Sequence, residues 1–524
     1  MKIINKIIAF VGIATLVASC SKQLDVTPID QVTSANVYTS KAGYKNVLAK
    51  VYAAMANTGS NGAGSGDVAD IDPGTSDFLR LYWKAQELST DEAVVAWGDA
   101  GIQDFHLMNW TSSNPMLQGL YYRCMYQITV ANEFLRQSTD AKLAANGITG
   151  ADADEVRKYR LEARFIRAYQ YANLMDLFGN PPFITEADEL GTIPKQILRK
   201  DLFAYVESEL KAIEPSMYPA RTNEYGRADM AAAQALLARI YLNAQVYTGT
   251  ERYTDAATYA KKVIDAGYSL ISDYTQLMLA DNNTNTSENI FTINYDGKRT
   301  QTYGGTTFLT HASVGGAMTA ADFGIGGGWV GLRTTKEIIA LYNNFISSSD
   351  TRKQFFTNGQ SLEISNLTTF TDGYSVTKYR NKTKGGVSGS DETFVDIDMP
   401  IFRLAEMYLI YAEAAVNGKA DINLATTYMN TIAKRAYGGT SQGDITSAQL
   451  TSDYIIKERA RELFWEGFRR TDLIRYNYFT TSNYLWTWKG GSKDGASVAS
   501  FRNLYPIPLK DLAANPNLKQ NTGY

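Results

Sequence analysis

Tryptophan, tyrosine and arginine side chains gather in two segments of this sequence, and their chemistry suits sugar rings. Flat C–H faces of a sugar ring pack on aromatic faces, each stack contributing about 1 kcal/mol, and an arginine offers forked donors to hydroxyls. The predicted ligand-binding residues are Arg80, Trp83, Trp97, Tyr303, Trp329 and Arg333. We expect at least two of the aromatic residues to line one site. The alternative for any single tryptophan is a buried loop anchor, because tryptophan is highly buried on average.

A second group of residues, at 458–472, has the composition of an acid–base site. Glu458, Glu462 and Glu466 are four residues apart, which places them on one face of a predicted helix, and arginines lie between them. A glycosidase needs two carboxylates across the bond that it cleaves, roughly 5 to 9 Å apart in a cleft. Ion pairs that fix the helix against its neighbours explain one crowded helix face better. We therefore expect no enzyme activity, with a surface glycosidase as the alternative.

Other motifs for metals and cofactors are weak. Four aspartates in an early Gly-rich segment could hold calcium, but their spacing differs from that of an EF-hand, so solvated loop acids are the favoured interpretation. These are Asp67, Asp70, Asp72 and Asp77. The two histidines, His106 and His311, leave little for a zinc site or imidazole catalysis. The Gly-rich stretch 324–328 lacks the Lys-Ser/Thr of a phosphate-binding loop. We expect no cofactor, and calcium remains an open alternative.

The N-terminus has the pattern of a lipoprotein signal. A short basic region precedes an apolar run over 7–17, and two small residues stand before Cys20. The pattern predicts a signal peptide over 1–19, acylation of Cys20 and a lipidated tether over 20–30. Several acyl chains hold a membrane durably, because each buried CH₂ contributes roughly 0.8 kcal/mol. The alternative is an ordinary signal peptide followed by a chance cysteine.

Composition narrows the class of the mature protein. The chain of 524 residues has a formal charge of −3, and removal of residues 1–19 with their two lysines changes this to −5. This mild acidity argues against nucleic acid as a partner. Cys124 is the only cysteine besides Cys20, so no disulfide framework is possible and stability must come from a large core.

Several segments carry apolar residues at helical spacing. The predicted helices cover 155–178, 230–247, 253–266, 401–416, 424–436 and 455–476. The pair over 230–267 resembles a tetratricopeptide unit with a longer loop. Polar, Gly-rich stretches at 56–79, 297–331 and 381–395 separate the helices, and rigid scaffolds display binding residues on such loops. The sequence predicts one mainly all-α domain over 31–524, a tetratricopeptide-like scaffold with long loop excursions and minor β-hairpins, one of them near 288–296.

Motifs in the helices and at the C-terminus resemble the SusD/RagB family. The motifs are EARFIRAY at 162–169, FGNPP at 178–182, ALLARIYL at 235–242, RLAEMYLIYAEA at 403–414, ERARELFWEGFRRTD at 458–472, LYPIP at 504–508 and NPNLKQNTGY at 515–524. Asn180 and Glu406 stand where the family usually has Asp. The prolines of the last segment predict an extended tail, not a helix, pinned onto the folded body. With the lipoprotein signal, the resemblance spans almost the whole mature chain.

The resemblance implies an outer-membrane lipoprotein that faces the cell exterior. It implies binding of an oligosaccharide or polysaccharide, without catalysis, and delivery to a partner TonB-dependent transporter of the SusC type. It also implies a shallow aromatic sugar site built from an early loop and a mid-chain loop. Trp83 or Trp97 lies in the matching early region, and Tyr303 and Trp329 lie in the matching mid-chain region, but no motif fixes them residue by residue. Peptide binding is an alternative, because the family includes peptide importers. A gate without a ligand site of its own is another.

Overall fold

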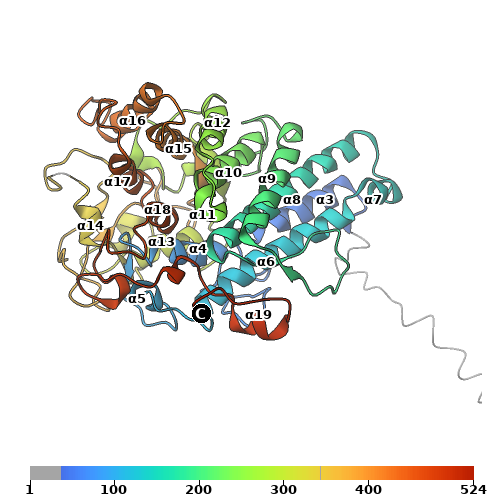
Figure 1. Ribbon diagram of the computed structural model, residues 1–524, viewed down its shortest axis with the longest axis horizontal. Coiled ribbons are helices and arrows are strands. Elements are labelled where there is room, and N and C mark those ends of the chain that lie inside the picture. Colours follow the sequence, from blue (N-terminus) through green and yellow to red (C-terminus); the bar gives the residue numbers. More distant parts are fainter. Residues whose placement is uncertain (1–36, 343) are drawn as a thin grey trace, which may run out of the picture.

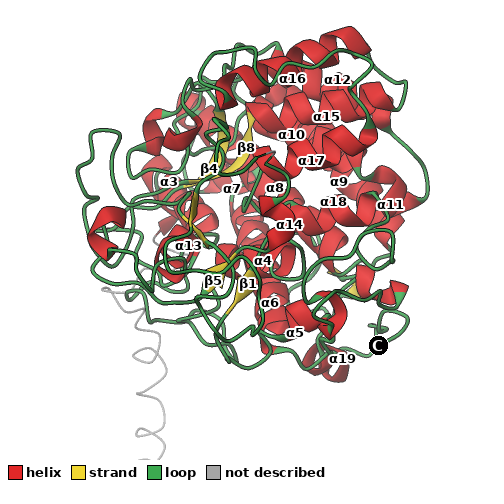
Figure 2. Ribbon diagram, turned by 90° about the vertical axis from the view of Figure 1, so that its left-hand side faces the viewer, coloured by secondary structure: helices red, strands yellow, loops and turns green. Residues whose placement is uncertain are grey.

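The computed structural model describes residues 37–342 and 344–524. Helices dominate this part of the chain, and its strands form two-stranded antiparallel sheets (Figure 1; Figure 2). The predicted mainly all-α class is confirmed. The predicted signal peptide, the tether and Cys20 lie outside the described residues.

The first half of the fold is a set of long helices packed side by side. Helices α6 (Pro115–Gln137) and α8 (Gly150–Leu177) run along one another, and α3 (Lys41–Ala53) and α9 (Arg199–Ile213) pack against α8 (Figure 1). Helix α6 begins where it does because the Asn114 side chain accepts hydrogen bonds from two backbone amides of the first turn, and proline fills the first helical position. The helix predicted over 155–178 is the C-terminal part of α8.

The second half contains the predicted tetratricopeptide-like pairs. Helix α10 (Met230–Leu242) packs on α12 (Tyr253–Ile264), α12 on α15 (Leu404–Val416), and α15 on α16 (Ile422–Ala436). Buried alanines, among them Ala235, Ala238, Ala256 and Ala260, allow the close approach of α10 and α12. The longer loop between those two helices holds the short helix α11 (Ala244–Thr248).

The single helix predicted over 455–476 is wrong, because the chain breaks in the middle. Helix α17 (Ser452–Glu462) ends before Trp465 and Gly467, whose φ angles are +61° and +88°, and α18 (Arg469–Arg475) follows. Two carboxylates from much earlier in the sequence accept hydrogen bonds from backbone amides that no longer have helical partners. Glu92 accepts from Trp465 N at 2.8 Å, and Glu87 accepts from Gly467 N at 2.6 Å. Tertiary hydrogen bonds therefore replace the helical ones.

The strands join segments that are distant in sequence. Strand β4 (Asn289–Ile293) is the one predicted near 288–296, but its antiparallel partner is β8 (Met399–Arg403) and not an adjacent hairpin strand. Strand β1 (Val94–Val95) pairs with β5 (Leu332–Arg333). The other pairs are β2 (Pro182–Phe183) with β3 (Lys195–Gln196), and β6 (Phe355–Phe356) with β7 (Ser375–Val376).

Shorter helices complete the described fold. They are α4 (Phe78–Glu87), α5 (Asp104–Leu107), α7 (Asp140–Ala145), α13 (Gly305–Ala312), α14 (Lys336–Ile339) and α19 (Leu509–Ala514). Helix α4 is buried along its whole length. Helix α13, inside the segment predicted as a long loop, is also completely buried.

The C-terminal tail is pinned onto the body as predicted, although it contains one helix. Tyr505 is fully buried, and its hydroxyl donates to the Ala85 carbonyl at 2.6 Å. At the last residue, Tyr524 donates to the Leu504 carbonyl, and Trp110 Nε1 donates to the Tyr524 hydroxyl, each at 2.6 Å. The prediction that no helix forms here is wrong, because α19 starts directly after Pro508, which occupies its N-cap.

Candidate functional site

The pairing of β1 with β5 brings two predicted site residues together across 232 positions of sequence. Beyond the strands, Ala96 N donates to the Gly331 carbonyl at 2.9 Å, which extends the ladder toward Trp97 and Trp329. Trp97 Nε1 donates to the Trp329 carbonyl at 2.9 Å. The two ring centroids lie 6.5 Å apart with planes tilted by 47°. Both side chains are half-buried, so each keeps part of its surface open to solvent.

The backbone beneath Trp329 is held by the end of α13. Trp329 N, Val330 N and Gly331 N donate to the carbonyls of residues 311, 314 and 312 at 2.7, 3.0 and 2.9 Å. Val330 takes a φ of +54°, which is rare for a β-branched residue, and its side chain is 45% exposed beside the tryptophans. At Gly331 a Cβ atom would lie 2.5 Å from the Trp97 ring, so only glycine allows this ring position.

His311 supports Trp329 from below, a role that its sequence position did not signal. The imidazole stacks on the Trp329 ring at 4.7 Å with an interplanar angle of 22°. Its nitrogens Nδ1 and Nε2 lie 2.6 and 2.9 Å from the carbonyl oxygens of Gly327 and Thr393. Desolvation by burial lowers the pKa of His311. The ring is therefore a fixed platform and not a free acid or base.

Arg80 joins the tryptophan pair to Tyr303. Its Nη1 donates to the Tyr303 carbonyl at 2.8 Å and to the Gly74 carbonyl at 3.1 Å. The guanidinium carbon lies 5.7 Å from the Trp97 ring centroid and 6.0 Å from that of Trp329. Burial lowers the pKa of Arg80 to about 10, so it stays charged at neutral pH. Arg80 is buried, so in place of the predicted ligand contact it provides a cation packed near the two tryptophan rings.

Tyr303 is joined to this group through its backbone carbonyl, and its ring is the most exposed of the predicted aromatic residues. Its side chain is 38% exposed, and it leans against Phe394 with ring centroids 5.4 Å apart. We call Arg80, Trp97, Tyr303 and Trp329 the aromatic site. The partly open rings of Trp97 and Trp329, tilted relative to one another, provide apolar faces for a ligand that curves.

Two predicted ligand contacts are wrong, because the structure buries them completely. Trp83 lies in the all-buried helix α4, donates from Nε1 to the Trp465 carbonyl at 3.0 Å, and packs edge-on against that tryptophan. Arg333 is 0% exposed and donates to the carbonyl of Leu367 at 2.8 Å, and to those of Gly331, Thr369 and Asp372. Both residues hold the frame of the aromatic site and present no surface to a ligand.

The glutamates considered for catalysis form buried ion pairs, as predicted. Glu458 pairs with Arg352 at 2.6 Å, Glu462 with Arg403 at 2.6 Å, and Glu466 with Lys378 at 2.6 Å. Burial alone would raise the pKa of Glu462, but Arg435, Arg403 and Arg352 outweigh burial and lower it to about 2. A carboxylate held ionised and sealed from solvent cannot protonate a glycosidic oxygen.

The aspartates considered for calcium mostly have other partners. Asp67 pairs with Arg123 at 2.5 Å. Asp77 caps α4 by accepting from Arg80 N at 2.7 Å, and it also accepts from Gly305 N at 2.8 Å. Across residues 37–342 and 344–524, no three His, Cys, Asp or Glu side chains are grouped so that they could hold a metal ion. The calcium alternative therefore gains no support from these residues.

None of the helices in the described part of the chain is long and apolar enough to cross a membrane.

A family profile described as "SusD family" matches residues 291–524. The chain is 35% identical to the "Starch-binding protein SusD" of Bacteroides thetaiotaomicron, over 97% of this chain and 96% of that protein. It is 27% identical to "SusD-like protein P2" of Formosa agariphila, over 72% and 76% of the two chains.

Solved structures share the fold. "Surface glycan-binding protein A" from Bacteroides thetaiotaomicron, in complex with laminarihexaose, superimposes with a TM-score of 0.68 at 21% identity, over 92% of this chain and 99% of that one. The protein of the same name from Bacteroides fluxus gives a TM-score of 0.70 at 21% identity, over 92% and 99%. The helical architecture is therefore common to these proteins.

Proposed function

Because this chain belongs to the SusD family, we propose that it binds a glycan at the cell surface through the aromatic site and passes it on unaltered. Members of the family bind carbohydrate and are not enzymes, in keeping with the burial of Glu458, Glu462 and Glu466. The observation that carries the proposal is the meeting of Trp97 and Trp329 above Arg80.

We propose Trp97, Tyr303 and Trp329 as the stacking residues and Arg80 as the group that holds them in place. Because the tryptophan rings are tilted relative to one another, they favour a curved glycan chain and disfavour a flat, ribbon-like one. A starch-type α-glucan is the first ligand to test, because the relative that is 35% identical is named for starch binding. The solved complex with laminarihexaose makes a β-glucan the second.

The proposed destination of the glycan is a partner TonB-dependent transporter of the SusC type in the outer membrane. The proposed anchor is an acylated Cys20, which would hold the protein to that membrane on its outer side. Stacking on a shallow surface suits transfer, because a ligand bound through few contacts dissociates quickly.

A binding screen tests the function. Purified protein comprising residues 21–524 is titrated with α-glucans, β-glucans, other polysaccharides and peptides, and binding is measured by isothermal titration calorimetry. We expect heat with at least one glycan and no shortening of that glycan. Binding heat with peptides only would favour the peptide-binding alternative. If the folded protein gives no binding heat with any member of the panel, the alternative of a gate without a ligand site of its own is favoured.

A substitution tests the site. Trp329→Ala removes one stacking face, and we expect at least tenfold weaker glycan binding with the fold unchanged. The matched control is Tyr428→Ala on α16, which removes a half-buried ring stacked on Tyr408 at 4.6 Å, away from α13 in both views (Figure 1; Figure 2). Unchanged affinity of the Trp329 variant would remove the mid-chain segment from the site.

A further inference from the structure

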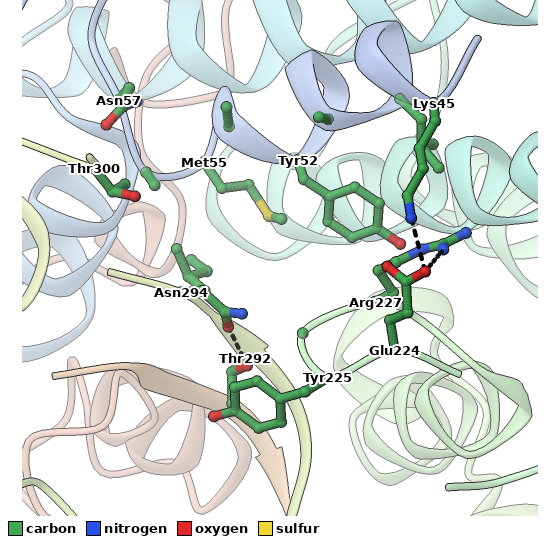
Figure 3. Close-up of a pocket in the computed structure, with 16 residues that line it drawn as sticks. Lys45, Tyr52, Met55, Asn57, Glu224, Tyr225, Arg227, Thr292, Asn294 and Thr300 are labelled. Atoms are coloured by element: carbon green, nitrogen blue, oxygen red, sulfur yellow. Dashed lines mark hydrogen bonds and ion pairs between the residues drawn. The ribbon is translucent and has the colours of Figure 1, made fainter. Parts of the chain in front are cut away.

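A second cavity opens between α3, the 224–227 turn and β4, and it shares no residue with the aromatic site. It has a volume of about 300 Å³, which is at the small end of the range for ligand pockets. Figure 3 shows the ring of Tyr52 on one wall, Asn294 and Tyr225 opposite it, and Lys45, Glu224 and Arg227 at one end.

The charged end of the cavity is neutralised internally. Lys45 Nζ lies 2.7 Å from Glu224 Oε1, and Arg227 Nη1 lies 3.3 Å from the same oxygen. Arg227 also pairs with Glu162 through Nη2 at 2.5 Å. Two cations and two carboxylates therefore balance. A charged ligand would find no unpaired counter-ion here, so the cavity favours an uncharged one.

The opposite end carries polar groups with unused hydrogen-bonding capacity. Asn57 Oδ1 is a buried atom without a hydrogen-bond partner. Asn294 accepts from the Thr292 hydroxyl at 2.5 Å through Oδ1, while its Nδ2 has no hydrogen-bond partner among the described residues. Gly226 makes room for this amide, because a Cβ there would lie 2.1 Å from Asn294 Nδ2. The exposed Asn294 amide thus offers a donor to the cavity, whereas Asn57 Oδ1 lacks a partner but lies beneath the accessible surface.

The remaining wall is aromatic and aliphatic. The Tyr52 hydroxyl is fully used, since it donates to Glu162 at 2.6 Å and accepts from Ala228 N at 3.0 Å, so only its ring is available to a ligand. Leu48 and Met55 extend this apolar wall. One apolar face opposed by amides is the arrangement that a sugar ring needs, with C–H groups on one side and hydroxyls on the other.

We propose that this cavity, which we call the α3 pocket, binds a single uncharged sugar ring, either a free monosaccharide or one unit of a short oligosaccharide. It is a second site, separate from the aromatic site. The choice of a sugar as its ligand rests on the proposed glycan-binding function, whereas the neutrality and the unpaired amides are properties of the pocket itself.

The test uses a protein whose aromatic site is disabled. Trp329→Ala is titrated with neutral monosaccharides and disaccharides, and binding is followed by saturation-transfer NMR and calorimetry. We expect at least one sugar to bind with the same affinity as to the parent protein. In the same background, Asn294→Ala should weaken that binding at least tenfold, while Asn109→Ala, an exposed asparagine outside the pocket, should leave it unchanged.

A second variant, which blocks the pocket, keeps the proposal testable if Asn294→Ala fails to fold. Ala49 lines the pocket from an exposed position of α3, so Ala49→Trp fills the pocket without disturbing the core. In the Trp329→Ala background it should abolish the monosaccharide signal, and in the parent background it should leave polysaccharide binding at the aromatic site intact. The proposal is overturned if no sugar binds the Trp329 variant, or if binding survives both Asn294→Ala and Ala49→Trp. Polysaccharide binding is measured separately, in Trp329→Ala alone. Failure of the proposed glycan-binding function is therefore distinguishable from failure of the α3 pocket proposal.

Discussion

Arg403 is the centre of the buried ion-pair network, and its removal should be among the most damaging single changes in the protein. Its guanidinium donates to Glu462 Oε1 at 2.6 Å, to Glu466 Oε2 at 2.7 Å and to Glu288 Oε1 at 3.0 Å. It also donates to the Glu462 carbonyl at 2.7 Å. Arg403→Met keeps the length and apolar stem of the side chain but leaves these acceptors short of a partner.

The structure sets the magnitude of the loss. The pKa of Glu462 falls from 4.5 to about 2 although burial opposes the shift, which corresponds to a net stabilisation of about 3 kcal/mol after the effect of burial is subtracted. Arg403 shares Glu462 with two other arginines, but it also serves Glu466, whose pKa is lowered by Arg403 and Lys378 despite burial. Removing one partner from a buried pair typically costs 3–5 kcal/mol. We expect Arg403→Met to lower the free energy of unfolding by about 3–5 kcal/mol at pH 7.

The pH dependence gives the sharper test. A carboxylate with a lowered folded-state pKa stabilises the protein above its unfolded pKa, and this stabilisation is lost as the pH falls through the folded pKa. The difference between parent and Arg403→Met should therefore be full at pH 7 and shrink between pH 4.5 and about 2. Guanidinium denaturation followed by tryptophan fluorescence at pH 7 and at pH 3 measures both values.

The control is an exposed ion pair. Arg299 pairs with Asp296 at 2.9 Å, but its side chain is 85% exposed, and Arg299→Met should change stability by less than about 1 kcal/mol. A loss below about 1 kcal/mol for Arg403→Met at pH 7, or a loss that grows toward pH 3, would refute the account of the network. Glycan affinity of the folded variant should match that of the parent.

Three other changes test separate parts of the structure. Burial raises the pKa of Asp77 to about 6, so the parent should lose stability as the pH rises from about 4 to 6. Asp77→Asn keeps the helix cap, and in thermal melts it should show a smaller decrease in stability over this pH range. Trp83→Phe should lower stability by about 1–3 kcal/mol, because it removes one of the two hydrogen bonds that the buried Trp465 carbonyl accepts and leaves a cavity beside the smaller ring. Glycan affinity should not change; weakened binding by folded protein would return Trp83 to the site. Cys20→Ala should release the protein from the membrane fraction on cell fractionation, and membrane retention equal to that of the parent would contradict lipidation.

The sequence predicted the helices whose pattern is local. Apolar spacing located α8, α10, α12, α15 and α16, because each buries one stripe against a neighbour. It did not predict the break after Glu462, since the amides at 465 and 467 are bound by carboxylates almost 400 residues earlier in the chain. The pairing of β4 with β8 was missed for the same reason: the partner strand is more than 100 residues away.

The candidate site shows a similar limit. Residue type and loop composition predicted Trp97, Tyr303 and Trp329 as stacking residues. The structure brings the two tryptophan rings together near Arg80, which also donates to the Tyr303 carbonyl. Type alone could not separate Trp97 from Trp83, because burial depends on α4 being enclosed on every side. Val330 was not predicted, and His311 was considered only for zinc binding or catalysis. Their contributions arise from a backbone angle and a stacking geometry that have no signature in a single sequence.

The burial of the C-terminal tail has a consequence for biosynthesis. Tyr505 packs at ring distances of 4.8 and 6.1 Å from Trp110 and Phe105, so an aromatic layer begun by two early residues is closed by a residue about 400 positions later in the sequence. A growing chain cannot close this aromatic layer until residue 505 has been synthesised. Closure of the layer is thereby coupled to synthesis of this segment, and copies clipped before residue 505 expose the aromatic surface of Trp110 and Phe105 to chaperones and proteases.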